Sequence, residues 1–203
     1  MKRKYFISKI NLKKQRKIYY VLIGLALTAL LFGVLFIFLL NDSNLLLIAE
    51  SINKYFKSIE LGNINILIKN LINNSSYIIL IWILGISIIG IPIILLLLLF
   101  KSFIFGFSLS SIIYTFKGKG ILLSLTYFFP NKIIYFITLL LITFYSLSFS
   151  IKLFHFLFLK KQINFKESMN KYLKILIISL ISSLLISIYE TFITSYILKF
   201  FNI

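Results

Sequence analysis

The feature that most constrains this chain is residues 77–116, a block that contains one charged residue, Lys101, and reads YIILIWILGISIIGIPIILLLLLFKSFIFGFSLSSIIYTF. Its first part, residues 77–100, would be roughly 36 Å long as an α-helix with a rise of 1.5 Å per residue. That length crosses a bilayer hydrocarbon core of about 30 Å with some tilt. We therefore predict one membrane-spanning helix over residues 77–100 and a shorter one over residues 102–116, with Lys101 at the inner face between them.

Three residues within the first of these helices weaken helical structure: Gly85, Gly90 and Pro92. A transmembrane helix tolerates such residues because neighbouring helices satisfy the backbone groups that they free. Small residues also let two helix backbones approach closely. We therefore expect Gly85, Gly90 and Pro92, and Gly106 in the next helix, to lie at contacts between helices.

The composition indicates a membrane protein with several spans. Hydrophobic residues make up 60% of the 203 residues, against about 45–50% in soluble domains. The formal net charge of +17 comes from 22 basic and 5 acidic residues, and the basic residues cluster beside apolar segments. The positive-inside rule explains this pattern better than nucleic-acid binding does. Because there is no cysteine, the chain has neither disulfides nor thiolate chemistry, and its redox compartment stays open.

The N-terminal segment predicts the orientation of the chain. Residues 1–17 contain eight basic residues and no acidic one, which should hold this tail in the cytoplasm against anionic headgroups. Residues 18–40 are uncharged, are longer than the apolar region of a signal peptide and lack a cleavage site. We expect them to form an uncleaved first transmembrane helix.

Residues 41–76 have a balanced charge and are predicted to lie outside the cytoplasm. Apolar residues recur there at spacings of three and four, as in an amphipathic helix: Leu45, Ile48, Ile52, Tyr55 and Ile59. We expect this helix to stop at Gly62 and a second, shorter one to follow over residues 64–72. Such helices either lie on the bilayer or cover the bundle, or they dock an extracytoplasmic partner.

The segment between the third and fourth predicted spans is unusual. Residues 117–120 read KGKG and predict a tight outer turn. Residues 121–129 are too few to cross a membrane. Pro130 disfavours helix at the residue before it and suits a helix that starts at Asn131. We therefore predict an outer hairpin or a re-entrant segment over residues 117–131.

The rest of the chain completes the predicted topology. Residues 132–159 should cross inward, and residues 160–174, with five lysines and one glutamate, should form a basic cytoplasmic loop. Residues 175–200 should cross outward. The predicted fold is all-α: one membrane domain, residues 1–203, forms a multi-pass helix bundle with about five transmembrane helices, a cytoplasmic N-terminus and an extracytoplasmic C-terminus.

Glu190 is the one carboxylate within a predicted span. An unpaired charge near the middle of a bilayer costs a few kcal/mol, so we expect Glu190 to be paired, protonated or close to the outer interface. Its polar neighbours in the sequence are Tyr189, Thr191 and Thr194. Lys132, at the outer start of the fourth predicted helix, is a candidate ion partner. The role of Glu190 is then either a buried contact between helices or the assembly of a complex.

The residues needed for catalysis or metal binding do not form a recognisable pattern. The chain has one histidine, His155, and five scattered acidic residues, with none of the spacings HExxH, GxSxG, Walker A or GxGxxG. His155 lies near Lys152 and Lys160, where an interfacial polar role is expected. We therefore predict no enzyme, no catalytic residues, no cofactor, no metal and no small-molecule substrate. The rival hypothesis is a permease-like subunit that works with a separate ATPase, because broken membrane segments are typical of transporters.

Two stretches resemble a known family. They read WILGISIIGIPIILLLLLFKSFIFGFSLSSI over residues 82–112 and GILLSLTYFFPN over residues 120–131. In both amino-acid sequence and position within the chain, residues 77–140 are similar to the stage II sporulation protein M family of endospore-forming bacteria.

This resemblance implies a function in forespore engulfment. It implies a membrane anchor in the mother-cell septal membrane, in a complex with stage II sporulation proteins D and P, which degrade peptidoglycan. The chain would recruit and position these enzymes without breaking bonds itself.

Overall fold

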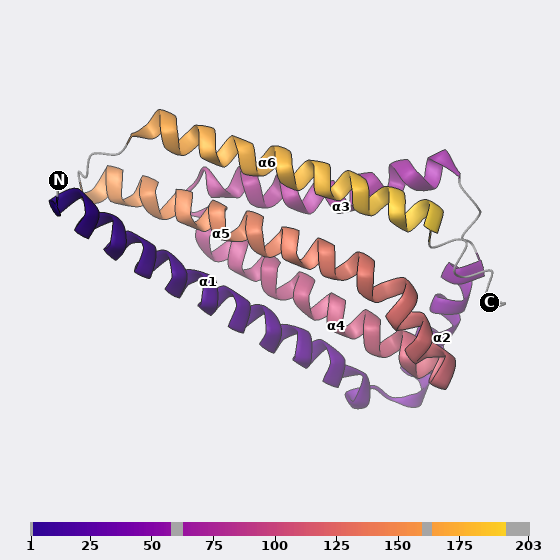
Figure 1. Ribbon diagram of the computed structural model, residues 1–203. Coiled ribbons are helices and arrows are strands. Elements are labelled where there is room, and N and C mark those ends of the chain that lie inside the picture. Colours follow the sequence, from indigo (N-terminus) through magenta and orange to yellow (C-terminus); the bar gives the residue numbers. More distant parts are fainter. Residues whose placement is uncertain (1, 58–62, 160–163, 194–203) are drawn as a thin grey trace.

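The computed structural model describes residues 2–57, 63–159 and 164–193 and shows a bundle of long helices (Figure 1). The helices are α1 (Lys2–Phe36), α2 (Asp42–Lys57), α3 (Ile64–Gly85), α4 (Gly90–Leu123), α5 (Phe129–Leu159) and α6 (Phe165–Ile188). Three short segments adjoin them: the 3₁₀ turn η1 (Ile37–Leu39), and the π-helical turns η2 (Ser124–Phe128) and η3 (Tyr189–Ile193). All regular structure in the described residues is helical, which confirms the predicted all-α class.

Within the part of the chain that the structure describes, five helical segments are long and apolar enough to cross a membrane. They are Arg16–Leu39, Ile64–Gly85, Gly90–Thr126, Phe129–Phe158 and Phe165–Ile193. The prediction of a membrane bundle with about five spans is confirmed. The first span agrees closely with the predicted residues 18–40, whereas the boundaries of the later spans differ from the prediction.

The long helices run alternately between the two ends of the bundle (Figure 1). At one end lie the start of α1, the turn from α3 to α4 and the start of α6, and we call this the basic end. Its described basic side chains on α1 and α6 are Arg16, Lys17, Lys166, Lys171 and Lys174. At the opposite end lie α2, the end of α4 and the end of α6, and we call this the α2 end.

The predicted helix over residues 77–100 is wrong, because the chain reverses within it. α3 ends at Gly85, and α4 starts at Gly90 after a tight turn. A Cβ atom on Gly90 would overlap the Leu84 carbonyl, so only glycine fits this turn. The Ser150 hydroxyl of α5 donates to the carbonyls of Gly85, at 2.6 Å, and Ser87, at 3.2 Å. These bonds satisfy two backbone carbonyls of an apolar turn from a neighbouring helix.

This turn changes two further assignments. α3 begins at Ile64, so the shorter helix expected outside the membrane over residues 64–72 is the first part of a spanning helix. Of the predicted outer segment, α2 alone has the expected amphipathic character, and its expected stop at Gly62 lies outside the described residues. The third span begins at Gly90 rather than at residue 102, so Lys101 lies within α4 instead of at the inner face.

The tight turn expected over residues 117–120 is present as a break within α4. The backbone at Lys117 has φ 50° and ψ −124°, which breaks the helix. Beyond it, Gly120 packs against the backbone of Ile112 and Ile113, so the chain folds back on itself there. The following residues are helical through η2 into α5, and they form no separate re-entrant segment. The helix start expected at Asn131 is also wrong, since Pro130 follows a helical Phe129 beside a π-helical turn that already interrupts the regular hydrogen bonding.

The last helix starts earlier than predicted. Asn164 caps α6 by accepting a hydrogen bond from the Glu167 amide at 3.2 Å, and α6 then runs from Phe165, so much of the predicted loop over residues 160–174 is helical. Asn63 caps α3 in the same way, accepting from the Asn65 amide at 2.9 Å. Residues 160–163 of that loop and 194–200 of the last predicted span lie outside the described residues.

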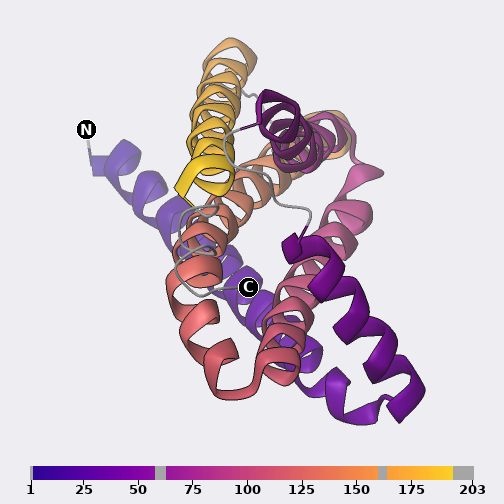
Figure 2. The same cartoon turned by 90° about the vertical axis from the view of Figure 1, so that its right-hand side faces the viewer.

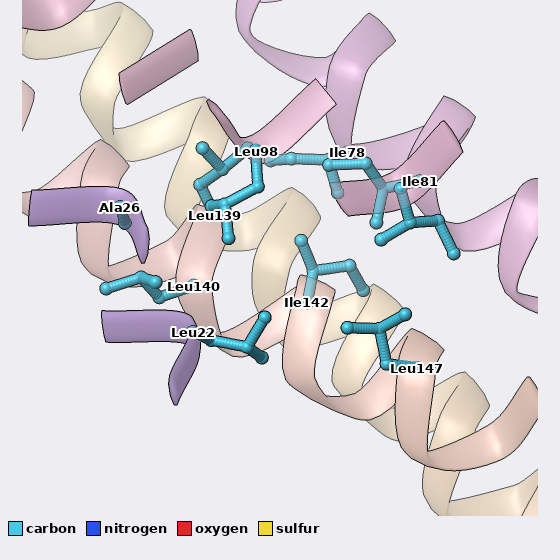
Figure 3. Close-up of a cluster of buried hydrophobic side chains, with 10 residues drawn as sticks. Leu22, Ala26, Ile78, Ile81, Leu98, Leu139, Leu140, Ile142 and Leu147 are labelled. Atoms are coloured by element: carbon cyan, nitrogen blue, oxygen red, sulfur yellow. The ribbon is translucent and has the colours of Figure 1, made fainter. Parts of the chain in front are cut away.

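The apolar core joins four helices (Figure 3). Its buried residues come from α1, α3, α4 and α5: Leu22, Ala26, Ile78, Ile81, Ile94, Leu98, Leu139, Leu140, Ile142 and Leu147. α1 and α4 approach most closely through two glycines. A Cβ atom on Gly106 would overlap the Leu30 carbonyl of α1, and one on Gly33 would overlap the Phe103 carbonyl of α4. The two helix backbones therefore touch at this crossing.

Candidate functional site

Charged and amide side chains gather between α3, α5 and α6, toward the α2 end. Lys132 Nζ on α5 donates to Glu190 Oε1 at 3.1 Å. Asn74 Nδ2 on α3 donates to Glu190 Oε2 at 3.3 Å. Glu190 is 9% exposed and the Lys132 side chain 27%. The ion pair expected from the sequence is therefore present, and an amide holds the second oxygen of its carboxylate. We call Lys132, Asn74 and Glu190 the polar cluster.

The local structure of α3 and α6 places this cluster. Asn70 and Asn74 are four residues apart and therefore lie on one face of α3. Their amides donate to Thr191 Oγ1 at 3.2 Å and to Ser187 Oγ at 3.0 Å. Glu190 lies in the π-helical turn η3, after Ser187 of α6 and directly before Thr191 of the same turn. Of the neighbours named from the sequence, Thr191 takes part in this network and Thr194 lies outside the described residues.

Hydroxyl groups continue from the polar cluster toward the basic end. Ser75 of α3 contacts Ser183 of α6 at 3.0 Å, and Thr138 of α5 contacts Ser182 of α6 at 2.8 Å. We call these four residues the polar seam. Because they are paired across the helices, the seam joins α3, α5 and α6 through hydrogen bonds rather than through apolar contacts alone.

Nearer the basic end, an aromatic group closes the same three helices. Tyr172 of α6 donates to the Trp82 carbonyl at 2.6 Å and contacts Ser146 at 2.9 Å. Its ring stacks on Trp82 and on Phe149, with centroids 5.4 Å and 4.6 Å apart. A side chain on Gly85 would overlap the Tyr172 hydroxyl. Gly85 therefore makes room for a buried tyrosine.

Lys101 is a cation within the membrane-spanning part of α4. Its Nζ lies 3.5 Å from the centroid of the Tyr77 ring on α3 and 6.0 Å from that of Tyr135 on α5. Among the residues that the structure describes, no carboxylate lies within ion-pair distance of Lys101. The Tyr135 hydroxyl and the Asn131 Oδ1 atom are buried without a hydrogen-bond partner. As far as the structure describes the chain, Lys101 thus has no ion-pair partner, and these two polar atoms of α5 have no hydrogen-bond partner.

The structure separates the interaction residues named from the sequence. Glu190 lies in the polar cluster, Gly85 beside Tyr172, Gly90 and Pro92 at the α3–α4 turn, Gly106 at the α1–α4 crossing, and Pro130 at the start of α5. Pro92 is exposed in the first turn of α4, where its missing amide hydrogen costs nothing, so the helix contact expected for it is wrong.

Several residues of the site were missed in the sequence. Asn70 and Asn74 were assigned to an outer segment, although their spacing of four within an apolar stretch was a usable signal. The contacts of Tyr77 and Tyr135 with Lys101 depend on the packing of α3, α4 and α5. No local sequence pattern reveals this packing. Among the described residues, no group of three His, Cys, Asp or Glu side chains could hold a metal ion.

The comparisons with known proteins identify the family. Residues 22–195 match the family described as stage II sporulation protein M. No curated protein and no solved structure matches the chain. The matched region includes residues 22–39 of the first span and the whole of the other four. Because the match covers nearly the whole sequence, the chain belongs to the stage II sporulation protein M family.

Proposed function

We propose that this protein is a non-enzymatic membrane scaffold of the sporulation engulfment machinery. In this role it anchors and localises peptidoglycan-degrading partners at the septal membrane, and the family resemblance implies stage II sporulation proteins D and P as those partners. The observation that carries the proposal is the family match across the membrane bundle, which links the chain to sporulation. The family is also not known as a family of enzymes.

The charge distribution supports an orientation for this scaffold. The described ends of α1 and α6 at the basic end carry Arg16, Lys17, Lys166, Lys171 and Lys174. Cytoplasmic segments of membrane proteins are enriched in such residues. We therefore place the basic end in the cytoplasm and the α2 end outside, with an extracytoplasmic C-terminus. The α2 end then faces the cell wall, where peptidoglycan is cut.

In this orientation, two described segments are available to extracytoplasmic partners. The first is α2, whose Leu45 is buried while Leu46 and Leu47 are exposed. The second is the hairpin around Lys117. Attachment of two enzymes to one membrane protein raises their effective concentration near the wall and limits where they act. A scaffold of this kind needs docking surfaces and no reacting groups.

The test is affinity purification of the tagged protein from detergent-solubilised sporulating cells, followed by mass spectrometry. We expect peptidoglycan hydrolases to be recovered with the unmodified chain and to be lost when residues 46–54 of α2 are scrambled. The matched control replaces Lys166 and Lys174 by alanine at the other end of the bundle, and it should retain the hydrolases. If no hydrolase is recovered with the unmodified chain, the scaffold proposal is wrong.

A second candidate function is a permease-like subunit that works with a separate ATPase. The observation that favours it is the polar seam together with Lys101, since polar and charged groups inside a bundle are typical of substrate paths. In the same purification, this candidate predicts a nucleotide-binding ATPase instead of hydrolases. Its contact would be the basic end, so the alanine variant of Lys166 and Lys174 should then lose the partner.

A further inference from the structure

We propose that Lys101 is a docking point for an acidic side chain carried by the transmembrane helix of a partner protein. The inference deepens the proposed scaffold function, because it names the chemistry by which a membrane-anchored partner would be held. It is drawn from the position of one charge in the bundle and from the residues around it.

The first step is the depth of the charge. Lys101 follows Gly90, the first residue of α4, by 11 residues, which is roughly 16 Å along the helix axis. α4 continues beyond Lys101 for roughly 24 Å to the break at Lys117. Lys101 therefore lies near the middle of a span that covers a hydrocarbon core of about 30 Å. A charge at this depth is costly and marks a functional site unless it is paired.

The second step is that the chain itself supplies no counter-ion among its described residues. Glu190 pairs with Lys132, and Glu167 pairs with Lys171. Asp42 and Glu50 belong to α2, at the end of the bundle. The Tyr77 ring offers Lys101 a cation–π contact, which attracts the ammonium but adds no negative charge. Among the described residues, no carboxylate of the bundle thus balances the charge of Lys101.

The third step concerns access. Lys101 is partly exposed, and the views in Figures 1 and 2 show α3 and α4 joined at the basic end and separating toward the α2 end. Both helices carry exposed apolar side chains in this region: Phe100 directly precedes Lys101 on α4, and Leu80 follows Tyr77 by three residues on α3. A helix that packs on these apolar side chains would bring its own side chains to the ammonium.

The fourth step decides what carries the anion. Lipid phosphates lie at the bilayer surface, about 15 Å from its centre, which is farther than a lysine side chain extends from mid-span. A carboxylate on a spanning helix reaches this depth directly. Polar side chains of transmembrane helices also form hydrogen bonds to neighbouring helices. A glutamate or aspartate near the middle of a partner's span is therefore the occupant that fits.

The test uses designed peptides in vesicles of phosphatidylcholine. The purified full chain is reconstituted with a fluorescent helix of about 20 leucines, flanked by lysines, that carries Glu, Gln or Leu at its centre. Association is measured by energy transfer from a donor on the protein. We expect the Glu peptide to bind about tenfold more tightly than the Leu peptide, and more tightly than the Gln peptide.

Variants of the chain test whether Lys101 causes the tighter binding of the Glu peptide. Lys101→Met should abolish this preference, and Lys101→Arg should keep it. The matched control is Lys69→Met, on the exposed face of α3, which should leave the preference unchanged. Equal binding of the three peptides by the unmodified chain overturns the proposal even if Lys101→Met fails to fold. If excess soluble acetate removes the preference for the Glu peptide, the proposal is also overturned, because Lys101 would then bind small anions in general. Because the vesicles contain no sporulation protein, failure here leaves the hydrolase purification as a separate test of the scaffold.

Discussion

The α1–α4 crossing and the α3–α5–α6 contact are two different ways of holding membrane helices together. At the crossing, Gly33 and Gly106 bring two backbones into direct contact without polar side chains. Across α3, α5 and α6, amides, hydroxyls and an ion pair link the helices. Lipid tails are as apolar as the helices, so association within a bilayer depends on close packing or on hydrogen bonds. This protein uses close packing at the α1–α4 crossing and hydrogen bonds at the α3–α5–α6 contact. The stability of the crossing should therefore depend on side-chain volume, and that of the α3–α5–α6 contact on the presence of each polar partner.

The largest effect is expected at the crossing. Gly106→Leu would place a side chain where the α1 backbone lies, and we expect a loss of about 3 kcal/mol in the free energy of unfolding. The measurement is unfolding in mixed detergent micelles with increasing dodecyl sulfate. The matched control is Gly24→Leu, because a side chain at Gly24 would meet nothing within 4 Å. If the two variants lose equal stability, the crossing is not a steric contact.

The ion pair should give the next largest effect. Glu190→Leu leaves Lys132 unpaired in a partly buried setting, and Lys132→Met does the same to Glu190. We expect each single change to lower the free energy of unfolding by about 2–3 kcal/mol. The double variant should lose less than the sum of the two, because no unpaired charge remains. Additive losses in this double-mutant cycle would mean that the pair contributes no coupling energy.

The polar seam should respond more weakly. Ser183→Ala removes the contact with Ser75 across the α3–α6 interface, and we expect a loss of about 0.6 kcal/mol, the average for such bonds in membranes. The same micelle assay applies. Ser76→Ala is the control, because the Ser76 hydroxyl is exposed and bonds to the Ile72 carbonyl of its own helix. Its effect should be close to zero, and a loss as large as that of Ser183→Ala would contradict a role for the seam in packing.

The smallest effect is expected at the hairpin that links the two regions. Lys117 has φ 50°, in the part of conformational space that glycine adopts readily. Lys117→Gly should therefore raise the free energy of unfolding by about 0.5 kcal/mol, as relief of backbone strain exceeds the added freedom of the unfolded chain. Lys119→Gly, at a helical position, should lower it. A loss of stability in both variants would show that the turn is not strained.

The fold class and the family could be read from the sequence, while part of the site could not. Lys132 was named as a candidate partner of Glu190, because Glu190 is the one carboxylate within a predicted span and Lys132 stands at the outer start of another. Asn74 was not named as a partner, because the start of α3 lies in a segment of balanced charge that was assigned to the outside of the membrane. The cap at Asn63 is the one local feature that marks this helix start. The surroundings of Lys101 were also missed, since its contacts come from α3 and α5.

The all-α membrane class, the number of apolar spans and the two basic segments follow from the amino-acid sequence. Hydrophobic length and charge are local properties, and the bilayer selects on both. The turn between Gly85 and Gly90 and the pairing of the charges depend instead on contacts between distant parts of the chain. An apolar turn is stable there because Ser150, 65 residues beyond Gly85, bonds to its carbonyls. Hydropathy alone carries no record of such distant partners, so the turn looked like the middle of a helix.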